Sequence, residues 1–204
     1  DFANWKSTQR TTIDQKLAEG VSGDTLWELL PSSLPRPETE VEESILYSKS
    51  MLRRALLEEQ GYLCCYCNRA LSESYTTIIE HFKPKGLLTY RNQTFDYQNL
   101  LACCDGGERD KGKLRESYCS LYKGSKDPSS PFSIISPLEA ACEDSFEYDE
   151  RGQILAVTSD SRSEYTIGFL NLRAKSLQLQ RAAAINTYIY EIWSEEMDTA
   201  AELD

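Results

Sequence analysis

The sequence has a single histidine, His81, among 204 residues. It has no run of the roughly 18 apolar residues that a membrane-spanning helix needs, and its first residues lack the pattern of a signal peptide. It also has no internal repeat and no glycine-rich phosphate-binding loop, which excludes the solenoid and P-loop ATPase classes. We therefore expect a cytoplasmic protein without membrane association, in which all imidazole chemistry depends on one residue.

Basic residues are scarce as well. The net charge is −11, which argues against tight autonomous DNA binding because phosphate contacts depend on Lys and Arg. From Met51 to Asp127 there are 12 Lys and Arg against 10 Asp and Glu, a net charge of +2, so the flanks carry −13. We expect these acidic flanks to be either solvated helices or a surface that docks on a basic partner protein.

The spacing of the cysteines predicts a metal site. Two of the seven cysteines form the pair Cys64-x-x-Cys67, and a second group follows much later in the chain. Thiols at this spacing can hold zinc from one end of a loop, and two further thiols complete a closed tetrahedral site. In a reducing compartment, thiolate–metal bonds are favoured over disulfides. Within the second group, Cys103 is the alternative to Cys104. The sequence predicts a structural zinc held by Cys64, Cys67, Cys104 and Cys119, with Cys142 in the core.

The predicted zinc fixes the segment that carries His81. Residues 76–79 are two threonines and two isoleucines, which favours a strand that ends near Glu80 and His81. Successive side chains of a strand point to opposite faces, so these two residues serve different tasks unless the strand has already ended. Lys83 and Lys85 flank a proline and are candidate phosphate contacts beside a base.

His81 has two interpretations, a structural histidine with satisfied nitrogens and a general base. Asn99 favours the second, because the predicted zinc site holds it a few residues before the second cysteine group. Asparagine commonly caps a turn. Its carboxamide oxygen can also accept a hydrogen bond from Nδ1–H of His81, which would hold the tautomer whose Nε2 takes a proton from water. We therefore expect His81 to be the base and Asn99 to orient it.

Periodicity and turn signals divide the rest of the chain. A helical stripe over residues 40–60 stops at Gly61 and leads to the first cysteine pair. We expect one compact α+β domain in three parts, an N-terminal helical region (1–60), a zinc core (61–127), and a β-hairpin with C-terminal helices (128–204). The expected hairpin strands are 145–148 and 153–158, and the expected C-terminal helices are 163–172 and 175–200.

Taken together, these motifs resemble the HNH nuclease family, in the variant of Septu-type and retron-linked anti-phage systems. The resemblance covers most of the chain and extends to Leu170-Asn171-Leu172. Its main motifs are Cys64-x-x-Cys67, Ile79-Glu80-His81-Phe82-Lys83-Pro84-Lys85, Tyr97-x-Asn99-Leu100-Leu101 with Cys104, and Cys119-x-x-x-Lys123-Gly124.

The resemblance implies a ββα-metal (HNH) core that hydrolyses phosphodiester bonds, with DNA preferred as substrate. His81 would be the general base, Asn99 its orienter, and Glu80 a ligand of a catalytic divalent ion, magnesium or manganese. Lys123 would join Lys83 and Lys85 as a nucleic-acid contact. The implied partner is an ABC/SMC-like ATPase subunit of the PtuA type, which works beside the nuclease and controls it.

One position departs from the family pattern. Ser120 stands at the third motif position, where the family usually has histidine, asparagine or aspartate, and a serine hydroxyl is a poor metal ligand. Asp105, Asp110, water or a group from the partner would have to complete the divalent site. The alternative function is therefore a zinc-stapled binding or regulatory subunit of the same complex with weak or no cleavage activity.

Overall fold

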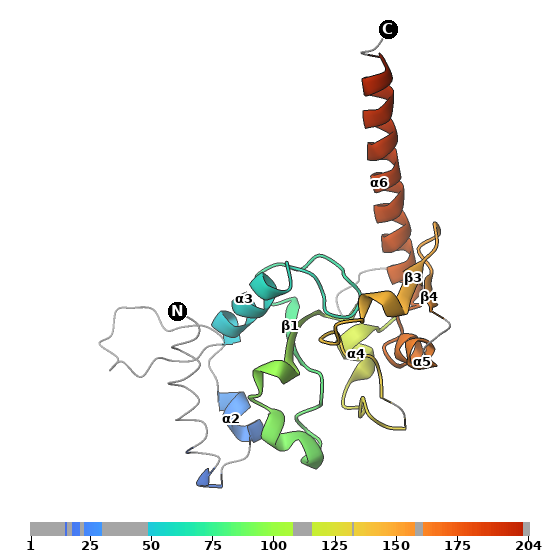
Figure 1. The fold of residues 1–204 in the computed structure, drawn as a ribbon. Helices are drawn as coiled ribbons and strands as arrows, with labels where there is room; N and C mark the ends of the chain where they lie inside the picture. The colour runs from blue at the N-terminus through green and yellow to red at the C-terminus, as the bar shows by residue number, and fades with distance from the viewer. Residues whose placement is uncertain are drawn as a thin grey trace, which may run out of the picture.

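The computed structural model describes residues 15, 18–20, 23–29, 49–107, 116–131, 133–157 and 161–201, without the side chains of 23, 24, 29 and 192–201 (Figure 1). Most of the expected N-terminal helical region lies outside these residues. The helices are α2 (Gly23–Leu29), α3 (Lys49–Glu59), α4 (Cys119–Lys123), α5 (Ser161–Phe169) and α6 (Lys175–Ala201), and the strands are β1 (Thr77–His81), β2 (Leu100–Cys104), β3 (Phe146–Tyr148) and β4 (Ile154–Ala156). Short 3₁₀ helices span Leu88–Gln93, Tyr97–Asn99 and Glu143–Ser145.

Helix α3 leads into the first cysteine pair, as the sequence predicts. Its buried face consists of three leucines, and the chain leaves the helix at Gly61, whose φ of 59° suits glycine. Just after the helix, the Gln60 side chain donates to the Ala102 carbonyl at 2.9 Å and accepts from the Ala102 amide at 2.7 Å. This two-point contact fixes the end of α3 against β2 and so positions Cys64.

Strands β1 and β2 form an antiparallel pair in which Thr77 faces Cys104 and His81 faces Leu100. The predicted strand before the histidine is therefore present. Every residue of β2 is buried, and α4 packs against it. Leu100 and Ala102 pack into a cluster with α3, whereas Cys103 and Cys104 belong to a second cluster on the side of the C-terminal elements. Strand β2 thus lies between the two hydrophobic clusters.

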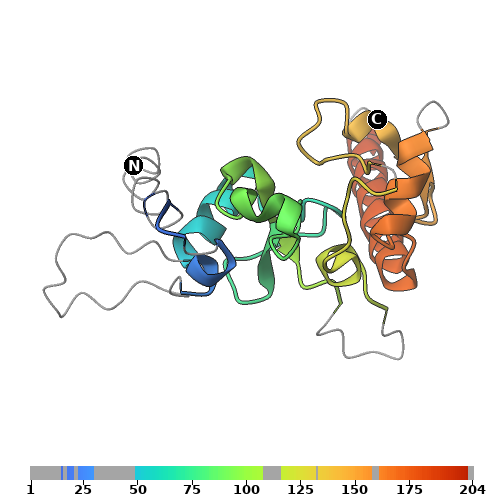
Figure 2. The same ribbon diagram turned by 90° about the horizontal axis from the view of Figure 1, so that it is seen from below.

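The C-terminal part contains the predicted hairpin and helices. Strands β3 and β4 are antiparallel, and the turn between them uses Gly152 at a φ of 73°. Helix α6 starts beside the core, where Leu177 is buried, and then extends away from the rest of the molecule (Figure 1). Figure 2 shows the same helix nearly end-on. Leu179 and Ile189 of α6 are exposed, so this part of the helix is not core. None of the helices within the described ranges is long and apolar enough to cross a membrane.

Candidate metal centre and active site

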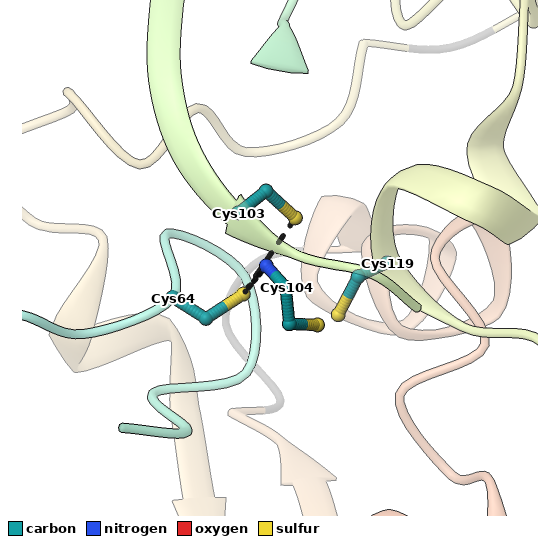
Figure 3. Close-up of side chains that lie close together, drawn as sticks. All are labelled: Cys64, Cys103, Cys104 and Cys119. Carbon is teal, nitrogen blue, oxygen red and sulfur yellow. Dashed lines mark hydrogen bonds between the residues drawn. The ribbon is translucent and has the colours of Figure 1, made fainter. Parts of the chain in front are cut away.

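Four buried cysteines bring their sulfur atoms together beside β2 (Figure 3). The Sγ atoms of Cys64, Cys103, Cys104 and Cys119 all lie within 4.8 Å of one another, and those of Cys64 and Cys103 are 3.6 Å apart. A tetrahedral zinc with Zn–S bonds of about 2.3 Å places its sulfurs about 3.8 Å apart. Burial raises the pKa of the Cys103 and Cys119 thiols, so a cation is needed to make them thiolates. The donor set fits a structural zinc.

The position of Cys67 leaves the choice of the fourth ligand open. Its Sγ lies 3.9 Å from Cys104 Sγ, but it is outside the group of four, in which Cys103 takes its place. Five thiols therefore surround one centre that takes four. The prediction that Cys67 is the fourth zinc ligand therefore stays a prediction. Cys142 is only half-buried, so the prediction that it belongs to the core is met in part.

The cysteines reach the centre from three segments of the chain. Cys64 opens a turn in which its amide donates to the Arg69 carbonyl at 2.9 Å and Asn68 has a φ of 57°. Cys119 begins α4 at a φ of 51°, uncommon for a residue with a side chain, and its amide donates to the Leu170 carbonyl at 2.9 Å. The centre thus joins the loop after α3, strand β2 and the C-terminal part.

The imidazole of His81 is buried and has a defined tautomer. Its Nε2 lies 3.1 Å from the Thr94 carbonyl oxygen, which can only accept, so Nε2 carries the hydrogen and Nδ1 carries the lone pair. The ring of Trp27 contacts His81 edge-on, with ring centroids 4.5 Å apart. Burial lowers the pKa of His81 to about 4, so the ring is neutral near pH 7. The predicted tautomer, with the proton on Nδ1, is wrong.

Asn99 does not contact the imidazole, which corrects its predicted role. Its Oδ1 accepts from the Lys83 amide at 2.7 Å, and its Nδ2 donates to the carbonyls of Lys83 and Gln93 at 3.0 and 3.1 Å. These backbone groups saturate the carboxamide. Asn99 therefore ties the end of β1 to the loop that carries Thr94, and it influences His81 only through that loop.

Glu80 points away from His81, as strand alternation predicts, and forms a buried ion pair. Its Oε1 lies 2.7 Å from Lys123 Nζ and 3.2 Å from the Tyr66 hydroxyl. The Lys123 side chain is 1% exposed, and its ammonium also donates to the His81 carbonyl at 2.9 Å. Burial raises the pKa of Glu80, and Lys123 opposes this rise. The prediction that Lys123 contacts nucleic acid is wrong, because its charge is enclosed by the protein.

The other predicted site residues that the structure describes have contacts of their own. Ser120 Oγ donates to the Cys104 carbonyl at 3.2 Å, and Asp105 accepts from the Gly107 amide. Asp110 lies outside the described residues. Lys85 pairs with Glu28 at 2.9 Å. The ammonium of the remaining predicted contact, Lys83, lies 5.5 Å from the centre of the Tyr90 ring.

These positions do not fit an open divalent site. Glu80 is engaged by an ammonium and a hydroxyl, and Ser120 uses its hydroxyl hydrogen on a backbone carbonyl. Among the described residues, the cysteines are the only group of three or more Cys, His, Asp or Glu side chains placed to hold a metal ion. The predicted divalent ion is therefore not supported by its expected ligands.

Sequence reasoning did not identify three of the contacts that define the site. Thr94 acts through its backbone, and Trp27 and Tyr66 reach His81 and Glu80 from elsewhere in the chain. None of these contacts leaves a local signal in the sequence. The burial of Lys123 could have been predicted from the sequence. Lys123 lies in the same short helix as the zinc ligand Cys119, which holds that helix close to β2.

Comparisons with known proteins identify the family. No protein-family model matches the chain. A protein of retron Vc95 from Vibrio cholerae serotype O1 biovar El Tor, named as an HNH endonuclease, is 30% identical over 148 residues, which are 70% of this chain and 67% of the relative. The Septu protein PtuB of Bacillus thuringiensis is 33% identical, and a protein of retron Ec83 from Escherichia coli, also named as an HNH endonuclease, is 35% identical. Each of these two matches spans 89 residues, 40% of this chain and 34% of the relative.

The chain belongs to the HNH endonuclease family. Within the family it is similar to the proteins of retrons Vc95 and Ec83 and to PtuB of the Septu system.

Proposed function

We propose that the chain is an HNH endonuclease that hydrolyses DNA as the effector subunit of an anti-phage complex. The observation that carries this proposal is the state of His81. The imidazole is neutral, its Nε2–H is fixed by the Thr94 carbonyl, and the lone pair of Nδ1 is free to take a proton. A neutral imidazole in a fixed orientation is suited to deprotonate an attacking water.

In the proposed reaction, Nδ1 of His81 removes a proton from water as the water oxygen attacks the phosphorus. The bond from phosphorus to the leaving sugar oxygen breaks, and that oxygen takes up a proton from solvent. Lys83 and Lys85, two and four residues further along the chain, would hold the phosphate. Asn99 would keep the loop of Thr94 in place. His81 is 7% exposed and Trp27 lies against it, so a phosphodiester can reach Nδ1 only when α2 moves aside. No step uses a divalent ion at Glu80, because the carboxylate is already paired.

The proposed partner is an ATPase subunit, ABC/SMC-like and of the PtuA type. Support comes from the similarity to PtuB, a protein of the Septu system, and from the charge of the chain. A net charge of −11 makes tight binding to bare DNA unfavourable. The ATPase would supply the grip on DNA and would control access to His81.

Plasmid cleavage tests the proposal. The chain alone and the chain with a PtuA-type ATPase are incubated with DNA, in the wild type and in His81→Ala. We expect the complex to cut and the His81→Ala complex to lose cleavage while it keeps its zinc and its fold. A His81→Ala complex that cuts at the wild-type rate would show that the base lies elsewhere.

A second candidate function is a zinc-stapled binding subunit of the same complex without cleavage. The ion pair between Glu80 and Lys123 favours it, together with the hydroxyl at position 120. The same assay separates the two functions. This second function predicts a stable complex that does not cut DNA, either with the wild-type chain or with His81→Ala.

A further inference from the structure

The carboxylate of Glu80 forms an ion pair with the ammonium of Lys123. Lys123 Nζ lies 2.7 Å from Oε1, within the range of a charge-assisted hydrogen bond, and the Tyr66 hydroxyl contacts the same oxygen at 3.2 Å. The side chains of Lys123 and Glu80 are 1% and 10% exposed. Two opposite charges are therefore enclosed together and satisfied by each other.

We propose that the ammonium of Lys123 takes the place of a divalent metal ion at Glu80, so that the zinc-loaded chain binds no magnesium or manganese there. This inference rests on the proposed HNH nuclease function, for which the family resemblance implies a divalent ion at Glu80, but it concerns ion binding and not cleavage.

The fixed position of Lys123 supports the exchange. Helix α4 begins at Cys119, within the cysteine centre, and ends at Lys123. The ammonium makes a second hydrogen bond, to the His81 carbonyl at 2.9 Å. Lys123 is thus held by the zinc ligand at the start of its helix and by two oxygen atoms of β1. It is also a positioning residue for His81, because it binds the backbone of that residue.

A divalent ion and Lys123 exclude each other at this carboxylate. An ion bound to Glu80 would either lie next to the buried ammonium or leave that ammonium buried without its partner, and both arrangements are strongly unfavourable. The described residues offer no compensating ligand, since their only metal-binding group is that of the cysteines. Removing the ammonium should therefore strengthen divalent binding by about a hundredfold, the low end of what breaking a buried pair costs.

The test is a titration of the zinc-loaded full chain with Mn²⁺, followed by electron paramagnetic resonance of the free ion and by NMR of the imidazole. His81 is the only histidine, so its ring signal is assigned at once, and an ion at the neighbouring Glu80 would broaden it. In the wild type we expect no Mn²⁺ site and no selective broadening up to about 1 mM Mn²⁺. A wild-type chain that binds one Mn²⁺ at micromolar concentration and loses the His81 signal overturns the proposal.

Variants make the test specific. Lys123→Met keeps the apolar stem and removes the charge, and it should gain a Mn²⁺ site that the double variant Lys123→Met with Glu80→Gln loses again. Lys126→Met is the matched control, because Lys126 donates to the Phe169 carbonyl at 3.2 Å and lies outside the Glu80 pair. Lys126→Met should gain no site. A Lys123→Met chain that is folded and zinc-loaded but binds no Mn²⁺ also overturns the proposal.

The wild-type titration stands even when a variant fails to fold. It is also separate from cleavage. A chain that binds no Mn²⁺, and whose complex with the ATPase cuts no DNA, leaves this inference intact and removes the proposed nuclease function. Cleavage that needs magnesium and disappears in Glu80→Gln would support the nuclease function and overturn this inference.

Discussion

The rings of Trp27 and His81 meet edge to face, with centroids 4.5 Å apart, although 53 residues separate them in the sequence. Trp27 belongs to α2, and the next residue of that helix, Glu28, pairs with Lys85 at 2.9 Å. Helix α2 is thus attached at two points, His81 and Lys85, to the chain segment that carries the candidate base. Access to His81 and the position of α2 are linked.

Replacing Trp27 should expose the base. In Trp27→Ala the imidazole loses the ring that shields it, so its pKa should rise toward the ordinary value of about 6.5. Its reaction with diethyl pyrocarbonate should become several-fold faster. The reaction is simple to follow because the chain has one histidine. Trp27→Phe, which keeps an aromatic ring, is the control, and equal rates in the wild type and Trp27→Ala would contradict the shielding.

The buried imidazole should make stability depend on pH. The pKa of His81 is lowered to about 4 in the folded protein, whereas the unfolded chain takes up the proton near 6.5. Unfolding is therefore favoured as the pH falls from 6.5 to 4, and the full stabilisation of about 3 kcal/mol is present only above 6.5. Chemical denaturation of the wild type and His81→Gln should show the two curves converging toward pH 4. Parallel curves would be incompatible with a neutral buried ring.

Asn99 should matter for stability and not for the tautomer of His81. Asn99→Ala removes three hydrogen bonds to backbone groups and leaves buried partners unsatisfied, which should cost about 2–4 kcal/mol. Nitrogen NMR should still show the hydrogen on Nε2 of His81, because Thr94 holds it. Asn92→Ala, at an exposed position, should cost little. A change of tautomer in Asn99→Ala would instead support the direct hydrogen bond between Asn99 and His81 that the sequence suggested.

The cysteine centre should bind about one zinc per chain and should be needed for folding. Cys64→Ser and Cys119→Ser should lose zinc and solubility, whereas Cys142→Ser should keep both. Of Cys67→Ser and Cys103→Ser, we expect one to lose the metal, since five thiols compete for four positions. Metal analysis of the purified variants decides this. A folded, zinc-free wild-type protein would rule out the structural zinc.

Local patterns in the sequence predicted several of the elements. The β-branched run before His81 forms β1, the spacing around Gly152 gives the hairpin, and the cysteine spacing brings Cys64, Cys104 and Cys119 into one centre. Each of these features depends on residues close together in the chain or on the preference of one metal for one ligand type.

The partners of the polar side chains were decided only by the tertiary structure. Asn99 and His81 were expected to bond to each other, but each found a backbone carbonyl or amide that the folded loop brought nearer. Lys123 was expected at the surface, yet the buried charge of Glu80 needed a counterion and α4 supplied it. A hydrogen-bonding group can be satisfied by many partners, and burial selects among them. The sequence by itself therefore determined three of the four clustered cysteines and the single histidine, and the packing of distant segments determined what each polar group of the site contacts.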